Sequence, residues 1–175
     1  FLDSLDKFLQ MMNKDGRKTG LVLSTTNKHV RSILESKTRE GYQAFFSQSE
    51  FEKSPLENKI LVGSRALFQG VNIRGLDFVI MNAIPFPLYD EKYKANTKYL
   101  THVGGLDAWK DFTIPQVLND ITQATGRLWR SKDDKGVICI TDSRLMGRFA
   151  WMVNKISSVR PGIRIQKYKA EDLEG

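Results

Sequence analysis

The fold follows from one stretch of the sequence, residues 116–131, which reads QVLNDITQATGRLWRS. At 3.6 residues per turn, its apolar side chains recur along one side of a helix and its polar side chains along the other. The polar stripe contains Gln116, Asp120, Gln123, Arg127 and Arg130, and the apolar stripe contains Val117, Ile121, Ala124 and Leu128. We therefore predict a packed helix over 116–131 that presents its two arginines to something outside the domain.

Arg127 and Arg130 are the first candidates for chemistry. Two planar, always-charged guanidinium groups three residues apart suit a polyphosphate whose charge grows during phosphoryl transfer, as arginine fingers do. The alternative is a solvated polar face on which the arginines pair with carboxylates. The spacing alone leaves both interpretations open.

Composition indicates one globular domain. The chain has 175 residues, of which 41% are hydrophobic and 27% charged, which is ordinary for a domain with a core. No apolar run approaches the ~20 residues of a membrane helix. We therefore expect no membrane contact and a cytoplasmic location, or a nuclear one if the source is eukaryotic. Because the sequence begins with Phe1 rather than Met, we expect a piece of a longer protein.

Charge and cysteine usage narrow the class of protein further. The net charge of +7 favours an anionic partner such as nucleic acid. The single cysteine, Cys139, lies in an apolar run and is expected to be a buried thiol, which excludes a disulfide scaffold and predicts no metal site. His29 and His102 are expected to be surface residues.

Strands alternate with helices along the chain, which is typical of a parallel sheet covered by helices on both faces. We predict strands at 21–23, 42–46, 59–63, 78–83 and 137–141, an edge strand near 163–168, and helices at 1–12, 28–36, within 47–58 and at 143–157. The alternation stops between Pro85 and Pro115, where an exposed helix over 89–102 is expected.

Polar residues follow two of the predicted strands. Ser24, Thr25 and Thr26 precede the 28–36 helix, where they can cap the helix or hold a phosphate at its positive end, and capping is the preferred interpretation. The stretch 60–75 reads ILVGSRALFQGVNIRG. In it, Gly63 and Gly70 would allow close approach of a ligand to the backbone, and Ser64 and Arg65 offer a hydroxyl and a charge to phosphates.

Taken in chain order, these motifs resemble the second RecA-like motor domain of superfamily 2 helicases, specifically the DinG/XPD-like group. Residues 21–26 look like motif IV, 62–75 like motif V and 123–130 like motif VI, and the group's PFP turn is matched at 85–87. The resemblance implies an α/β, RecA-like domain with a mainly parallel central sheet flanked by helices on both faces, a P-loop NTPase-like three-layer sandwich. It also implies a single domain over 1–175 with an insertion at about 86–114.

The resemblance further implies a role for each candidate residue. Arg127 and Arg130 would be catalytic arginine fingers that reach ATP held by an N-terminal motor domain absent from this chain. ATP binding and coupling would fall to Gln123, Gly126, Gln69, Gly70 and Asn72. A groove for single-stranded nucleic acid, DNA rather than RNA, would be lined by Ser24, Thr25, Thr26, Ser64 and Arg65. Members commonly carry acidic residues where this chain has Gln69 and Asn72, so negative charge is lost there.

The sequence lacks a G-x-x-x-x-G-K-[ST] phosphate loop and an acidic magnesium box. ATP and Mg would therefore be bound mainly by the N-terminal half, which is also the only place for an iron-sulfur cluster. Three functions stay open: the motor half of an ATP-dependent DNA helicase, inactive in isolation; a helicase-like module that grips nucleic acid or a partner protein without turnover; and an unrelated nucleotide-binding α/β enzyme.

Three further residues carry expectations about structure. Asp142 and Arg144 are expected to pin the end of a strand by hydrogen bonding rather than to take part in chemistry. Trp109 is expected either to pack in the core or to stack on a base.

Overall fold

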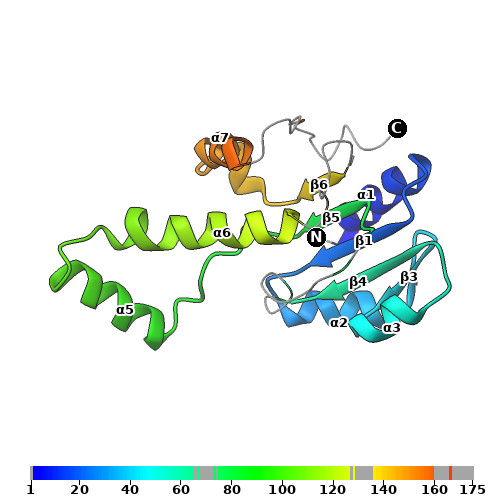
Figure 1. Ribbon diagram of the computed structural model, residues 1–175, viewed down its shortest axis with the longest axis horizontal. Coiled ribbons are helices and arrows are strands. Elements are labelled where there is room, and N and C mark those ends of the chain that lie inside the picture. The colour runs from blue at the N-terminus through cyan, green and yellow to red at the C-terminus, as the bar shows by residue number, and fades with distance from the viewer. Residues whose placement is uncertain are drawn as a thin grey trace.

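The computed structural model describes residues 2–64, 67, 73, 75–126, 128, 136–159 and 166. Helices and strands alternate along most of this length (Figure 1). In chain order the elements are α1 (Leu2–Lys14), β1 (Thr19–Leu23), α2 (Asn27–Glu35), β2 (Thr38–Arg39), β3 (Tyr42–Phe45), α3 (Gln48–Lys53), β4 (Lys59–Gly63), β5 (Phe78–Met81), α5 (Glu91–His102), the π-helix η1 (Ala108–Thr113), α6 (Ile114–Thr125), β6 (Val137–Ile140), the 3₁₀ helix η2 (Ser143–Met146) and α7 (Ala150–Val159).

The strands form one sheet in the order β2-β3-β4-β1-β5-β6. Every neighbouring pair is parallel except β2 and β3, which form a short antiparallel edge. Leu21 of β1 lies beside Leu61 of β4 and Val79 of β5, so β1 is central and hydrogen-bonded on both sides. The predicted α/β architecture with a mainly parallel sheet is confirmed.

Each face of the sheet has its own core, because successive side chains of a strand point to opposite faces. Leu21 and Leu23 of β1 pack in a cluster with residues of α3, α6 and α7, whereas Val22 packs with residues of α1 and α2. The predicted coverage of both faces by helices is therefore confirmed. Cys139 is buried in the second cluster, and this burial raises the pKa of its thiol to about 12, so the thiol stays protonated.

The amino edge of the sheet is closed by Asp77, which directly precedes β5. Its carboxylate accepts the backbone N–H groups of Lys18 at 2.8 Å and Thr19 at 2.9 Å, and the Thr19 hydroxyl at 3.1 Å. The Tyr42 hydroxyl donates to the Arg17 carbonyl at 2.6 Å. Burial, and then the charge of Asp77, raises the pKa of Tyr42 to about 12, which keeps that hydroxyl a donor.

Gly20 of β1 makes room for an aromatic ring at the same edge. A Cβ at this position would lie 2.1 Å from the ring of Phe78, which packs edge-on against Tyr42 with centroids 5.6 Å apart. The glycine is thus required for packing between neighbouring strands.

The predicted helix over 116–131 is correct at its start and wrong at its end. α6 ends at Thr125 with Gly126 as C-cap, and Gly126 N–H donates to the Thr122 carbonyl at 2.8 Å. Leu128 then turns onto Gly136, where a Cβ would lie 2.6 Å from the Cβ of Leu128. Leu128, the last apolar residue of the predicted stripe, therefore packs beside the beginning of β6 instead of continuing the helix. Arg127 and Arg130 lie outside the described residues.

The apolar stripe of α6 is confirmed, since Val117, Ile121 and Ala124 are all buried. The polar stripe is wrong at Asp120, which is 0% exposed and faces the protein interior, while Gln123 is exposed as predicted. Helical periodicity places Asp120 at the border between the stripes, and tertiary packing assigns it to the buried side.

Two other predicted elements need correction or fall outside the description. The expected helix over 143–157 is two helices, η2 and α7, separated by a turn at Gly147. The predicted edge strand at 163–168 lies outside the described residues apart from Gln166. Within the described part of the chain, no helix is both long and apolar enough to cross a bilayer.

The segment between β5 and α6 leaves the sheet at its carboxyl edge and carries α5 away from the body of the domain (Figure 1). α5 has no buried residue. The prediction of an exposed helix here is confirmed over Glu91–His102. That the segment is an insertion relative to other domains stays a prediction.

Candidate nucleic-acid and nucleotide interface

The carboxyl ends of the parallel strands meet at one edge of the sheet. Leu23 of β1 lies beside Gly63 of β4 and Met81 of β5. Ser24 N–H donates to the Gly63 carbonyl at 2.9 Å, which holds the turns after β1 and β4 together. The structure therefore brings together the predicted strand ends that carry Ser24 and Ser64, at the place where open parallel sheets bind ligands.

Ser24 builds the turn after β1 rather than facing solvent. It is 0% exposed, and its hydroxyl donates to the Thr26 carbonyl at 3.0 Å and accepts Thr26 N–H at 3.1 Å. Thr26 is the N-cap residue of α2, but its side chain makes no capping hydrogen bond, so the prediction of capping is wrong. Thr25 is half-buried and Thr26 exposed. Neither hydroxyl makes a hydrogen bond among the described residues, and both remain available to a ligand.

Asn82 holds this turn in place, and sequence reasoning missed it. Its Oδ1 accepts Thr25 N–H at 2.8 Å, and its own N–H donates to the Leu23 carbonyl at 3.0 Å. Its carbonyl accepts the Thr141 hydroxyl at 3.0 Å, so one residue joins the ends of β1, β5 and β6. The available signal was an amide side chain directly after a buried strand.

His29 of α2 lies at the surface, half-exposed, and completes the Asn82 network. Because Asn82 Oδ1 is used by Thr25, the Nδ2 group faces His29 and donates to Nδ1 at 3.1 Å. The His29 ring is therefore neutral, with its proton on Nε2. Burial, followed by the positive charge of Lys28, lowers the pKa of His29.

Asp142 and Arg144 fix the turn after β5, as predicted. The Asp142 carboxylate is buried and accepts Ile84 N–H at 2.9 Å, while Arg144 donates to it through Nη2 at 2.6 Å and Nε at 2.8 Å. Burial alone would raise the pKa of Asp142, but the hydrogen bonds from Arg144 and Ile84 outweigh it and hold the pKa below its usual value. A charged carboxylate thus anchors the chain where it enters the 85–87 turn.

Both ends of the exposed segment stand on a group of stacked side chains, Phe86, Trp109, Phe149 and Arg144, which we call the aromatic clamp. Phe86 stacks on Trp109 with centroids 5.4 Å apart and contacts Phe149 at 5.0 Å. The Arg144 guanidinium lies 5.3 Å from the Phe86 centroid. Trp109 packs on these rings and is 40% exposed, so part of its surface still faces solvent and its stacking on a base stays a prediction.

The residues expected to face ATP are only partly described. Gln123 is exposed in the last turn of α6, and Gly126 caps that helix. Outside the described residues lie Arg127, Arg130, Gln69, Gly70 and Asn72, and so does Arg65 of the expected nucleic-acid groove.

Gly63, where close approach of a ligand to the backbone is expected, packs against a neighbouring side chain. A Cβ on Gly63 would lie 1.8 Å from the side chain of Leu67, so the glycine makes room for Leu67, and ligand approach at this position stays a prediction. Ser64 is half-buried, and its carbonyl accepts Leu67 N–H at 2.9 Å. Across the described ranges there is no group of three His, Cys, Asp or Glu side chains arranged to hold a metal ion.

Leu128 and the hydroxyl-bearing turns lie at opposite ends of the sheet. Leu128 packs on Gly136, just before β6, and β6 begins beside the start of β5, where Val137 pairs with Phe78. Ser24 and Ser64 follow the other ends of their strands.

The sequence matches the family described as Helicase C-terminal domain over residues 2–158. It is 30% identical over 157 residues to the ATP-dependent DNA helicase YoaA of Haemophilus influenzae, a match that covers 84% of this chain and 24% of that protein. It is 24% identical over 182 residues to the ATP-dependent helicase DinG of Mycobacterium tuberculosis, which covers 93% of this chain and 27% of that protein. The chain thus spans about a quarter of the length of these curated relatives.

Solved structures show the same fold. An XPD helicase structure superposes with a TM-score of 0.63 at 18% identity, covering 88% of this chain and 30% of that one. The C-terminal domain of the DEAD-box protein Dbp5 superposes with a TM-score of 0.51 at 13% identity, covering 91% of this chain and 81% of that one. With the RecA-like fold and the family match in agreement, this chain belongs to the helicase C-terminal domain family of the DinG, XPD and YoaA helicases.

Proposed function

We propose that this chain is the C-terminal motor domain of an ATP-dependent DNA helicase. In this proposal an N-terminal motor domain of the same polypeptide binds ATP and Mg, and the two domains close on each other when ATP is bound. The observation that carries the proposal is the meeting of the Ser24 and Ser64 turns at the carboxyl edge of a RecA-like sheet. The family match and the helicase relatives support it.

The strand-binding half of the proposal uses the carboxyl edge. Thr25 and Thr26 would contact the sugar-phosphate backbone, joined by Ser64 and Arg65, while buried Ser24 and Asn82 hold the turn in shape. Contacts to phosphate carry no base information, so binding would show little sequence preference and would weaken with salt. DNA is the proposed substrate because the relative YoaA is named an ATP-dependent DNA helicase.

The nucleotide half of the proposal uses the segment after α6. Arg127 and Arg130 would act as arginine fingers that stabilise the negative charge which develops on the transferred phosphoryl group. α6 is packed along its length by Val117, Ile121 and Ala124, which makes it a rigid support for the residues that follow. Gln123 and Gly126, with Gln69, Gly70 and Asn72, would contact the nucleotide and couple it to the strand.

ATP turnover by the full-length protein tests this assignment. Arg127→Ala and Arg130→Ala should each lower the rate of strand-stimulated ATP hydrolysis by about 10³-fold, the lower end for an arginine finger, and leave strand affinity nearly unchanged. Ser64→Ala and Arg65→Ala should weaken strand binding and leave the maximal hydrolysis rate nearly unchanged. Lys155→Ala, at an exposed position on α7, is the matched control. Unchanged hydrolysis in both arginine variants would remove the finger assignment.

A second candidate function is a helicase-like module that binds nucleic acid without turnover. It is favoured by Gln69 and Asn72, which stand where relatives in the group commonly carry acidic side chains. Strand binding by the full-length protein, with no strand-stimulated hydrolysis in the wild type, would select this second function.

A further inference from the structure

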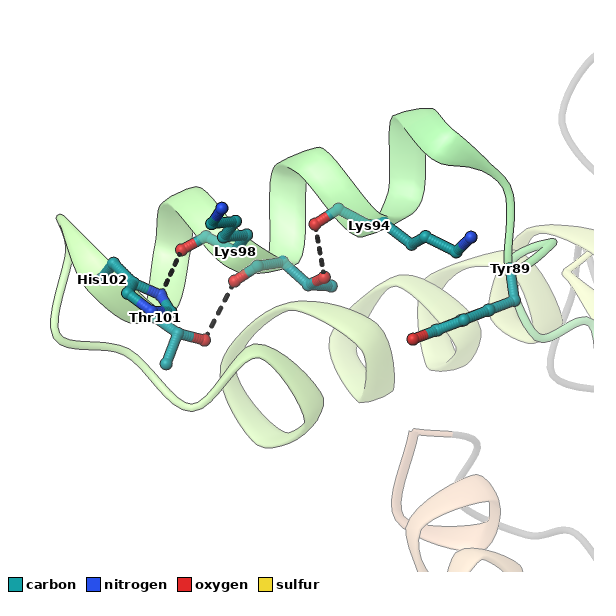
Figure 2. Close-up of a pocket in the computed structure, with 6 residues that line it drawn as sticks. Tyr89, Lys94, Lys98, Thr101 and His102 are labelled. Atoms are coloured by element: carbon teal, nitrogen blue, oxygen red, sulfur yellow. Dashed lines mark hydrogen bonds between the residues drawn. The ribbon is translucent and has the colours of Figure 1, made fainter.

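One face of α5 has no part in the proposed site. A hollow of about 300 Å³ lies along this face, and Figure 2 shows Lys94, Lys98, Thr101 and His102 on the same side of the helix, with Tyr89 near its beginning. Thr97 completes the lining. The spacing explains the common face, because residues four and seven positions apart on a helix lie above one another. We call this the α5 face.

The side chains of the α5 face are held by short local contacts. The Thr97 hydroxyl donates to the Lys94 carbonyl at 3.0 Å, and the Thr101 hydroxyl donates to the Thr97 carbonyl at 2.9 Å. Since a carbonyl can only accept, His102 Nδ1 donates to the Lys98 carbonyl at 3.0 Å (Figure 2). These three side chains are therefore held against the helix backbone, and the charge available to a ligand on this face comes from elsewhere.

The charge of the α5 face comes from lysines alone, because its lining contains no carboxylate. The Lys98 ammonium makes no hydrogen bond or ion pair with any part of the chain that the structure describes. The Lys94 ammonium pairs with Glu91 at 2.7 Å, but the Glu91 side chain is 90% exposed, so this pair is weak and a ligand anion can compete for the lysine. The face thus offers positive charge that the domain itself leaves mostly unused.

An aromatic ring stands beside the lysines. Tyr89 is 76% exposed, and its ring centroid lies 5.3 Å from the Lys94 ammonium. Aromatic rings beside cations are the usual platform for single strands, because every base has a π-face and every nucleotide a phosphate. A protein partner would instead require several apolar anchors at the centre of the contact, and Tyr89 is the one large apolar side chain among the residues that line the hollow.

We propose that the α5 face binds the backbone of a single nucleic-acid strand where the strand continues beyond the carboxyl edge of the sheet. This inference rests on the proposed function, since it extends the strand path that begins at Thr25 and Thr26. The position agrees with it, because the chain that leads to α5 leaves the sheet at the end of β5 and α5 stands beyond that edge (Figure 1). Lys98 would contact a phosphate, and Tyr89 would stack on a base.

The test compares Lys98→Gln with Lys92→Gln in the full-length protein. Both variants remove one positive charge from an exposed position on α5, but Lys92 is about 200° around the helix from Lys94 and does not line the hollow. Fluorescence anisotropy would measure the affinity for labelled oligothymidylate and oligouridylate of about 30 nucleotides, longer than one binding site, over a range of salt concentrations.

Lys98→Gln should weaken binding to both oligonucleotides about fivefold and reduce the slope of log affinity against log salt by about 0.7, the value for one phosphate contact to a single strand. Lys92→Gln should change neither quantity. Tyr89→Ala should weaken binding with no change in slope, because stacking releases no counterions. Since α5 has no buried residue, none of the three substitutions should alter thermal unfolding.

Three results would overturn the inference. Equal losses in the two lysine variants would mean that only the overall field of the protein matters. Strand binding that is insensitive to Lys98 and Tyr89, but is weakened by Ser64→Ala or Arg65→Ala, would remove the α5 face and leave the proposed function standing. A wild-type protein that binds no strand would contradict both the proposed function and this inference. That result is therefore distinguishable from a failure of the inference alone.

Discussion

The amino and carboxyl edges of the sheet are held by different kinds of polar contact. At the amino edge, the Asp77 carboxylate accepts two backbone N–H groups and one hydroxyl, so the polar groups there are used within the domain. At the carboxyl edge, Ser24 and Asn82 shape a turn whose neighbouring hydroxyls, on Thr25 and Thr26, make no hydrogen bond among the described residues. The difference separates contacts that stabilise the fold from groups that are available to a ligand.

The largest effect on stability should come from the amino edge. Asp77→Ala removes the acceptor of three hydrogen bonds and leaves the N–H groups of Lys18 and Thr19 unsatisfied, which should lower the free energy of unfolding by about 3 kcal/mol. Urea unfolding followed by circular dichroism measures it. Asp77→Asn keeps one carbonyl oxygen and should cost clearly less. If the two variants are equally stable, the hydrogen bonds accepted by Asp77 do not stabilise the amino edge.

The next effect belongs to the anchor beside the carboxyl edge. Asp142→Ala should lower the free energy of unfolding by about 2 kcal/mol, because Ile84 N–H and Arg144 lose a charged acceptor. The folded pKa of Asp142 is depressed, so its contribution is present above the unfolded pKa of about 3.9 and is lost as pH falls through the folded value. Unfolding measured from neutral to acid pH should therefore show a smaller acid dependence in Asp142→Asn than in the wild type.

A third pair of variants tests whether the carboxyl edge divides into support and contact. Thr26→Val should leave stability within about 0.5 kcal/mol of the wild type and weaken strand binding about fivefold, the worth of one hydrogen bond. Ser24→Ala should instead lower the free energy of unfolding by about 1 kcal/mol, because the buried turn loses its hydroxyl. Thermal unfolding and strand anisotropy on the same samples distinguish the two, and a Thr26→Val protein that binds normally would contradict the division.

The smallest effect should be a pH dependence at His29. The folded pKa of His29 is lowered, so below the unfolded pKa of about 6.5 the unfolded chain takes up a proton that the folded ring resists, and stability falls as pH falls towards the folded value. His29→Gln keeps an acceptor for Asn82 and should flatten this part of the stability curve. A curve of unchanged shape in the variant would show that the His29 to Asn82 contact does not control protonation.

Periodicity and chain order predicted the sheet and most helices because these depend on local pattern. β1, β4 and β5 are short apolar runs, and a run of that kind flanked by turns leaves few alternatives. The end of α6 at Thr125 was not predictable, because Leu128 beyond it packs on Gly136, a tertiary contact that helical periodicity does not show. The burial of Asp120 likewise depends on tertiary packing.

The candidate site was predictable in kind and less so in detail. Polar residues after buried strands of a parallel sheet had to meet at one edge, which places Ser24 and Ser64 together. Which of those side chains faces solvent depends on hydrogen bonds that the sequence does not show. Ser24 is buried by its bonds to Thr26, and Asn82 becomes central only because Thr25 and His29 lie within its reach.

The aromatic clamp has a consequence for how this domain can vary. Phe86 and Trp109 are in contact, so the chain that departs at one and returns at the other begins and ends at nearly the same point. A loop closed in this way can be lengthened or shortened at little cost, because closure entropy grows only slowly with length. Homologous domains could therefore carry an exposed segment of different length between Phe86 and Trp109 and leave both cores intact. This makes the segment the natural place for this architecture to acquire new specificity.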